Sequence, residues 1–246
     1  MLKTCKVLLR SAPTSVVMTF VLSVVLMNLL ANKEIATGIP WLALDCGMLI
    51  SWLSFFSMDM IAKRFGARAS VTISVVATLI NLAVCLVLFT AASVPGNWGA
   101  YYSYSDANVN EILNSTIGGT WYVLLGSSVA FLVSAMVNAL LNVAIGWCFK
   151  CDSFAEYAAR SWGSTILAQF VDNMVFSLMV SHVFFGWSLL QCVTCSITGC
   201  VVELLCQVIF TPAGYRITQE WQREEVGKDY LEYLEAMYGS TNHGNQ

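Results

Sequence analysis

The sequence contains few charged residues and no excess of basic ones. Only 11% of its 246 residues are Asp, Glu, Lys or Arg, whereas soluble domains contain about 25%. The 12 basic and 15 acidic side chains leave a net charge of −3, and all of this charge lies in the segment from Arg216 onward. The low charge argues against a soluble globular domain, and the missing basic surface argues against a nucleic-acid partner.

Apolar residues are abundant instead. They make up 57% of the chain and gather in blocks of about 20 residues, the length that crosses a bilayer. Six blocks are present: Val16–Ala31, Ile39–Ile61, Ala69–Ser93, Gly119–Cys148, Ser164–Phe185 and Ser188–Thr211. The sequence therefore predicts an all-α integral membrane protein, with a bundle of six transmembrane helices over residues 1–215 and an acidic cytoplasmic tail over 216–246.

The first block also resembles a signal peptide, because three basic residues precede it. No small-x-small cleavage site follows the block, and Asn28 lies near its end. We therefore expect an uncleaved first helix.

Basic residues set the expected orientation, because Lys and Arg concentrate in segments that face the cytoplasm. Eleven of them fall in the N-terminal segment, the loops that follow the second and fourth blocks, and the tail. Lys33 alone falls on the other side. This distribution predicts an even number of crossings with both termini cytoplasmic, as in a multi-pass protein of the bacterial inner membrane.

Two segments outside the blocks have predicted structures. The loop Pro95–Gly118 faces outward and is rich in aromatic residues that form either an interfacial belt or a lid: Trp98, Tyr101, Tyr102 and Tyr104. The tail segment Ile217–Tyr238 is predicted to form one amphipathic helix that ends at Gly239.

Cysteines and histidines give little support to metal or catalytic chemistry. Two C-x-x-C pairs, Cys148/Cys151 and Cys192/Cys195, have the spacing of thiolate metal ligands. The predicted topology places a membrane thickness between them, so no metal or cofactor is expected. His182 has no second histidine nearby and is expected to be a hydrogen-bonded packing residue rather than a proton carrier. The chain has no phosphate-binding loop, G-x-S-x-G or H-E-x-x-H motif, so we do not expect an enzyme.

Four acidic residues lie within the apolar blocks: Asp45, Asp59, Asp172 and Glu203. An ionisable side chain at membrane depth costs about 2.5–3.5 kcal/mol, so it faces the bundle interior and usually marks function. Asp45 also fits an interfacial position, and Asp59 also fits an ion pair with Lys63 four residues later. Asp172 lies at least seven residues from either end of its block and has no such simple explanation.

Polar and aromatic residues recur at helical spacing on several blocks. The stripes are Thr165, Gln169, Asp172 and Phe176 on the fifth block; Gly199, Glu203, Gln207 and Phe210 on the sixth; Asp45, Trp52, Phe55 and Asp59 on the second; Ser134, Asn138 and Asn142 on the fourth; and Asn28 on the first. Any one amide can simply join two helices. Taken together, carboxylates, amides and aromatic rings predict a polar cavity for a planar, nitrogen-rich solute.

The fifth block resembles the signature of a known family. Its residues Arg160, Ser164, Thr165, Gln169, Asp172 and Phe176 follow the pattern R-x-x-x-S-T-x-x-x-Q-x-x-D-x-x-x-F of the VUT family of bacterial queuosine precursor transporters. Three further stretches resemble that family: Asn28-Leu-Leu-Ala-Asn32-Lys33, Asp59 to Gly66, and Thr211-Pro212-x-x-Tyr215.

The resemblance implies a six-helix importer of 7-deazaguanine bases that serve in tRNA modification. For such a base, Asp172 is the first candidate to accept the paired N–H donors of the guanine-like edge, Gln169 to bond the ring carbonyl or N3 edge, and Trp52, Phe55 or Phe176 to stack on the ring. The residues expected to bind the solute are Asp172, Gln169, Thr165, Ser164, Phe176, Asn28, Asp59, Trp52, Phe55, Asn138, Glu203 and Gln207.

The chain also departs from the family pattern. Lys63 stands where the family often has Glu, Glu203 where it usually has Lys, and Asn138 and Asn142 where it typically has Gln and Asp. The exchange of Lys63 and Glu203 suggests a swapped ion pair. The alternative function is a substrate-binding subunit of an energy-coupling-factor importer of a vitamin or nucleobase, so the expected partners are a small planar solute, the lipid bilayer, and either further copies of the chain or an ATPase subunit.

Overall fold

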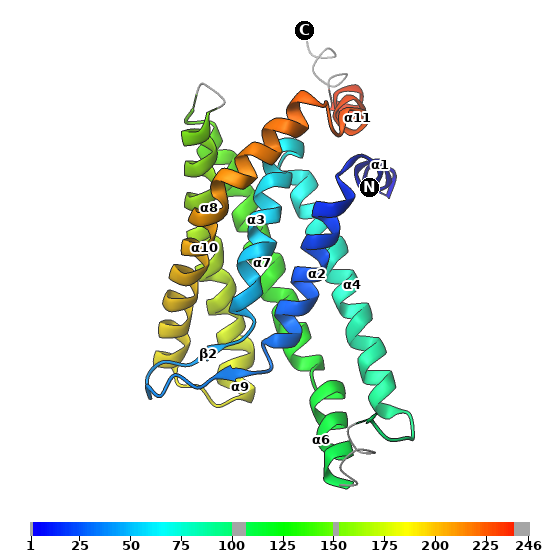
Figure 1. Ribbon diagram of the computed structural model, residues 1–246, viewed down its shortest axis with the longest axis vertical. Helices are drawn as coiled ribbons and strands as arrows, with labels where there is room; N and C mark the ends of the chain where they lie inside the picture. Colours follow the sequence, from blue (N-terminus) through cyan, green and yellow to red (C-terminus); the bar gives the residue numbers. More distant parts are fainter. Residues whose placement is uncertain (1, 100–106, 150–152, 239–246) are drawn as a thin grey trace.

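The computed structural model describes residues 2–99, 107–149 and 153–238, and it is a helical bundle with one short β-hairpin (Figure 1). Its helices are α1 (Leu2–Ser11), α2 (Thr14–Leu30), α3 (Met48–Phe65), α4 (Ala67–Ser93), α6 (Ala107–Gly118), α7 (Trp121–Gly146), α8 (Phe154–Phe176), α9 (His182–Phe184), α10 (Leu189–Arg223) and α11 (Lys228–Tyr238). Tyr101, Tyr102, Tyr104, Lys150, Cys151 and residues 239–246 lie outside the described residues.

Four of the described helical segments are long and apolar enough to cross a membrane, namely Ala67–Ser93, Asn108–Gly146, Phe154–Phe184 and Leu189–Arg223. A fifth span is obtained if α1 and α2, which meet at 109°, are counted together. The charges of Asp59, Lys63 and Arg64 keep α3 out of this set, although α3 packs against α2, α4, α7 and α10. The all-helical membrane architecture is therefore supported, and the count of six crossings stays a prediction.

Apolar side chains also cover the outside of the bundle. Leu79, Leu140 and Ile209 are 61–70% exposed, and only 33–39% of the residues in each candidate span are buried within the protein. Such a surface is costly in water and costs nothing in lipid. The inside of the bundle is held by aromatic rings, with Phe131 contacting both Phe20 and Phe55 at centroid distances of 5.9 and 6.3 Å.

The second block begins differently from the prediction. The sequence predicts one helix over Ile39–Ile61, but the helix begins at Met48 and the preceding residues form an antiparallel hairpin of β1 (Glu34–Ile35) and β2 (Leu44–Asp45). The next turn needs a glycine at position 47, because a Cβ there would lie 2.6 Å from the backbone oxygen of Met27. The Asp45 carboxylate accepts the Gly47 N–H at 2.7 Å. This turn ends the strand and starts α3, so Asp45 lies in the hairpin and not on a helix.

The first, third and fourth blocks agree with α2, α4 and α7 to within two residues, whereas α8 begins ten residues before the fifth block and α10 ends twelve residues after the sixth. α8 continues through a π-helical turn, η1 (Ser177–Ser181), into α9, and a turn at Gly186 leads into α10 as expected. Ser188 caps α10 in a capping box with Gln191. His182 contacts the backbone oxygen of Trp187 through Nδ1 at 2.6 Å, which agrees with a packing role.

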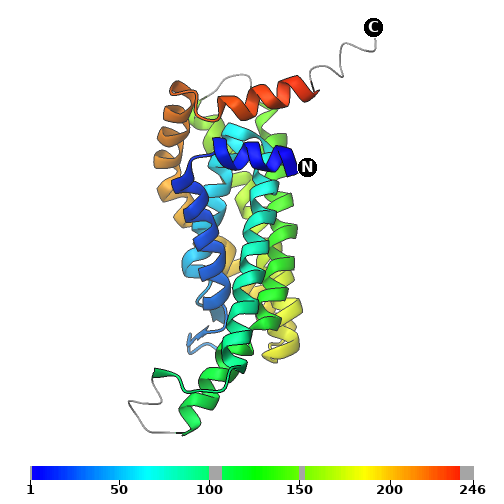
Figure 2. The same ribbon diagram turned by 90° about the vertical axis from the view of Figure 1, so that its right-hand side faces the viewer.

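The first and last described helices lie side by side at one end of the bundle and run across its axis (Figures 1 and 2). The single tail helix predicted over Ile217–Tyr238 is wrong: α10 continues to Arg223, and a turn with positive φ at Glu225 (51°) and Gly227 (79°) separates it from α11. The buried Tyr230 of α11 packs on Phe65 with the rings 6.2 Å apart. Because α10 runs through Tyr215, the division of the chain there stays a prediction.

Candidate solute-binding site

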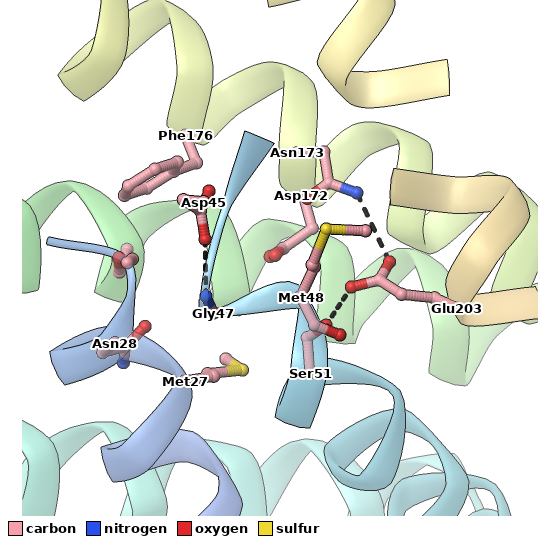
Figure 3. A pocket seen from close by; sticks show the side chains of 12 residues that line it. Met27, Asn28, Asp45, Gly47, Met48, Ser51, Asp172, Asn173, Phe176 and Glu203 are labelled. Atoms are coloured by element: carbon pink, nitrogen blue, oxygen red, sulfur yellow. Dashed lines mark hydrogen bonds between the residues drawn. The ribbon is translucent and has the colours of Figure 1, made fainter. Parts of the chain in front are cut away.

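A small cavity lies where α2, the hairpin, α3, α7, α8 and α10 meet (Figure 3). Its lining residues are Met27, Asn28, Ala31, Asp45, Gly47, Met48, Ser51, Ser127, Asp172, Asn173, Phe176 and Glu203. Four of the predicted site residues are among them: Asn28, Asp172, Phe176 and Glu203. The cavity is small. The centre of a water molecule can occupy about 30 Å³ of it, and by the same measure about 10–15 Å³ is enough to hold one water molecule.

Asp172 and Phe176 reach the cavity from consecutive turns of α8. The Ser134 hydroxyl of α7 donates to Asp172 Oδ1 at 2.7 Å. No other hydrogen bond to this carboxylate comes from the described residues, so its second oxygen can accept a bond from a solute. The ring of Phe176 lies beside Asp45 at the same side of the cavity (Figure 3).

Glu203 and Asp45 bring two further carboxylates to the cavity. Ser51 donates to Glu203 Oε1, and the Asn173 amide donates to Glu203 Oε2 at 3.3 Å. Asp45 is fixed by the backbone of the hairpin turn. The lining residues include no Lys, Arg or His, so three carboxylates face one cavity with no basic side chain among those that line it.

Two buried amides at this level lack hydrogen-bond partners among the described residues. Asn28 Nδ2 at the cavity wall is one case, and Gln169 lacks a partner at both Nε2 and Oε1 although the residue is fully buried. A buried polar group without a partner costs about 1–3 kcal/mol and needs an explanation. Gln169 precedes Asp172 by one turn, so its amide lies just beyond the cavity on the side of α1 and α11.

A second polar cluster surrounds Asp59, nearer to α1 and α11. Its carboxylate is fully buried and accepts hydrogen bonds from neutral donors on α7, α8 and α10. These donors are Asn138 at 2.8 Å, Asn142 at 3.3 Å, Ser161 at 2.7 Å, Thr165 at 3.2 Å and Gln207 at 2.8 Å. The structure thus places Asp59, Asn138, Thr165 and Gln207 together, in a cluster apart from the cavity.

Lys63 forms neither of the two ion pairs that the sequence suggested, with Asp59 or with Glu203. Its ammonium binds Glu156 of α8 at 2.5 Å, and Glu156 also binds Arg160 at 2.7 Å. Asp59 is held by neutral groups instead, so the pairing within α3 is a wrong alternative. The swapped pair of Lys63 and Glu203 is also wrong, because Ser51, which contacts Glu203, lies 12 residues before Lys63, or about 18 Å along a helix.

Three predicted site residues lie elsewhere. Trp52 stacks on Phe210 with ring centroids 4.6 Å apart, and its indole N–H donates to Leu49 of its own helix. Phe55 is buried in the apolar core. The Ser164 hydroxyl donates to the Ser161 backbone oxygen at 3.3 Å. None of the three lines the cavity, and a role for them in binding the solute stays a prediction.

Sequence reasoning missed several residues of the two polar sites. Ser51 and Asn173, which hold Glu203, were not proposed, although Asn173 is adjacent to Asp172 in the fifth-block motif. Glu156 was also missed, although its spacing of four residues from Arg160 indicates an ion pair. No group of three or more His, Cys, Asp or Glu residues within the described ranges could hold a metal ion.

The helices and the charged cavity define this chain as a multi-pass helical membrane protein. Residues 45–217 match the model of a family described as putative vitamin uptake transporter, and the chain belongs to that family. The match covers α3 to α9 and most of α10, and it includes Asp45, Asp172 and Glu203. No curated protein and no solved structure matches the chain.

Proposed function

We propose that the chain imports a queuosine precursor, a 7-deazaguanine base, across the bacterial inner membrane, and that the solute binds in the cavity around Asp172. Membership of a transporter family supports import. The observation that carries the choice of solute is the combination of Asp172, Phe176 and Asn28 in one cavity.

Asp172 suits the guanine-like edge of such a base. That edge presents N1–H and an exocyclic amine side by side, and a carboxylate accepts both. The hydrogen bond from the Ser134 hydroxyl to Oδ1 holds the Asp172 carboxylate in place. Phe176 offers a ring face for stacking, and the unpartnered Asn28 amide donates to a ring acceptor.

A bicyclic base needs more room than the cavity offers, so the helices around it must separate before the base binds. Such opening is the usual basis of alternating access in transporters. Widening toward Gln169 brings the solute to an amide whose donor and acceptor both lack partners. We assign Gln169 the role of binding the ring once the cavity is widened.

The test is binding of 7-cyano- and 7-aminomethyl-7-deazaguanine to the purified full chain in lipid nanodiscs, with guanine and biotin as comparison ligands. Wild type is expected to bind a deazaguanine saturably, and Asp172→Asn is expected to lose that binding. Asp229→Asn, on the exposed face of α11, is the matched control and should bind as wild type. A chain that binds no deazaguanine contradicts the proposal.

The same preparation decides whether the chain acts alone. Uptake of labelled base into liposomes that contain only this chain supports an autonomous importer. Uptake that appears only when an ATPase partner is present favours the substrate-binding subunit of an energy-coupling-factor importer. The loss of uptake in Asp172→Asn is expected in both cases.

A further inference from the structure

The charge of the cavity restricts the class of solute more than its shape does. Asp45, Asp172 and Glu203 approach it from the hairpin, α8 and α10, and no basic side chain is among its lining residues. Buried carboxylates are normally paired with a cation or a metal ion. Here the compensating charge is missing from the part of the cavity that the structure describes.

The arrangement does not suit a metal ion. No set of three acidic, histidine or cysteine residues in the described ranges converges closely enough to hold one. The three carboxylates are instead spread around the cavity, with Asp172 between Asp45 and Glu203 (Figure 3). Charges spread in this way match an extended ligand that carries its positive charge at some distance from its hydrogen-bonding edge.

We propose that the solute is an organic cation, a planar base that carries a protonated aliphatic amine, and that Glu203 and Asp45 select it by that charge. An ammonium group has three N–H donors and no acceptor, so it fits between the carboxylate oxygens of this cavity, while the unpartnered Asn28 N–H meets an acceptor of the planar base. Neutral bases and anionic vitamins are disfavoured, because a solute that fills the cavity takes the half-buried Asp45 and Asp172 out of water beside the buried Glu203, which is costly without a counter-charge. This proposal rests on the proposed function and specifies its substrate class.

Glu203 gives the sharper test, because both of its oxygens are already held. Ser51 and Asn173 bind it, so Glu203→Gln removes the charge and keeps a carbonyl acceptor in place. Asp45→Asn does the same in the hairpin, where the remaining oxygen still accepts the Gly47 N–H. Glu225→Gln in the exposed turn before α11 is the matched control.

The experiment measures the dissociation constants of four ligands on the full chain in nanodiscs. 7-Aminomethyl-7-deazaguanine carries a cationic amine, and 7-cyano-7-deazaguanine is its neutral counterpart. Thiamine is a cationic vitamin with planar rings, and biotin is an anionic one. Wild type is expected to prefer the aminomethyl base to the cyano base by about tenfold or more, the lower end of what close charge pairs contribute. Glu203→Gln is expected to remove most of that preference, and Glu225→Gln is expected to keep it.

The outcomes separate the two proposals. Equal or tighter binding of the cyano base overturns the cation proposal and leaves the deazaguanine importer intact. Binding of thiamine without either deazaguanine refutes both the queuosine precursor and the protonated amine, because the charge of thiamine lies on a thiazolium ring that has no N–H donor. A preference that survives both Glu203→Gln and Asp45→Asn overturns the assigned role of these two residues.

Discussion

The ion-pair network at Glu156 gives the most quantitative prediction. Glu156 is 4% exposed and is the anion shared by Lys63 of α3 and Arg160 of α8. The side chains of these two cations are only 12% and 13% exposed. Glu156→Gln removes the negative charge that the two cations share and leaves a neutral carbonyl oxygen in its place.

The magnitude follows from the geometry. At distances of 2.5 and 2.7 Å, each pair has a Coulomb attraction of about 6 kcal/mol at an effective dielectric constant of about 20. Desolvation offsets most of this attraction in the intact protein. Removing the shared anion leaves the desolvation cost without its compensation, and the expected loss in the free energy of unfolding is about 3–5 kcal/mol.

Denaturation of the purified protein in mixed micelles measures this loss. Glu225→Gln is the control, because Glu225 forms a comparable pair with Lys228 at 2.8 Å while the two side chains are 66% and 55% exposed. That variant should unfold as wild type does, because exposed pairs contribute little. The double variant Glu156→Gln/Lys63→Met should recover part of the loss. A Glu156→Gln variant as stable as Glu225→Gln would refute the predicted stabilisation by the buried ion pairs of Glu156.

Four further predictions follow from the contacts. Gly227→Ala should release α11 and expose the tail to trypsin, because φ is +79° and the new Cβ would lie 2.0 Å from the Phe65 ring; Gly99→Ala, with open space around it, should leave the digestion pattern unchanged. Phe176→Leu should weaken solute binding while Trp52→Phe should not, since only Phe176 lines the cavity; equal loss in both variants would move the stacking site. Gln169→Leu should raise the free energy of unfolding by about 1–2 kcal/mol, because it removes an unsatisfied buried amide, and should lower uptake. With an impermeant maleimide, Glu111→Cys should be labelled in intact cells, whereas Asp229→Cys should be labelled only after lysis. Labelling of both variants in intact cells would contradict the predicted topology.

The helices could be predicted because a bilayer requires long apolar runs, and each block contains one. The hairpin before α3 could not be found from hydropathy, because Ile39, Trp41 and Leu42 continue the apolar run. Gly38 and Pro40 were the available signals for a turn. Missing this turn extended the helical phase back to Asp45, and Trp52 and Phe55 were then assigned to the same face as Asp45. The structure places both rings against other helices.

The stripe on α8 contains residues of two separate polar sites, the Asp59 cluster and the cavity. Thr165 and Asp172 share a face, yet they are seven residues apart, or about 10 Å along the helix axis. Thr165 therefore contacts Asp59, while Asp172 faces the cavity. The same division holds on α10, where Glu203 lines the cavity and Gln207 binds Asp59 one turn later. Helical periodicity specifies the face of a residue, and its depth in the bundle depends on which neighbours pack beside it.

Gln169 links the two levels. It lies one turn from Asp172 on one side and one turn from Thr165 on the other, and its buried amide has no partner among the described residues at either level. A packing role would satisfy that amide, as it satisfies Asn142, which bonds both Asp59 and Arg160. The donor and the acceptor of Gln169 both lack partners, whereas Asn138 and Gln207 each keep a bond to Asp59, and the proposed function assigns the Gln169 amide to the solute. In the proposed transport cycle, a solute that leaves Asp172 toward the end where α1 and α11 lie would meet Gln169 first and the Asp59 cluster next.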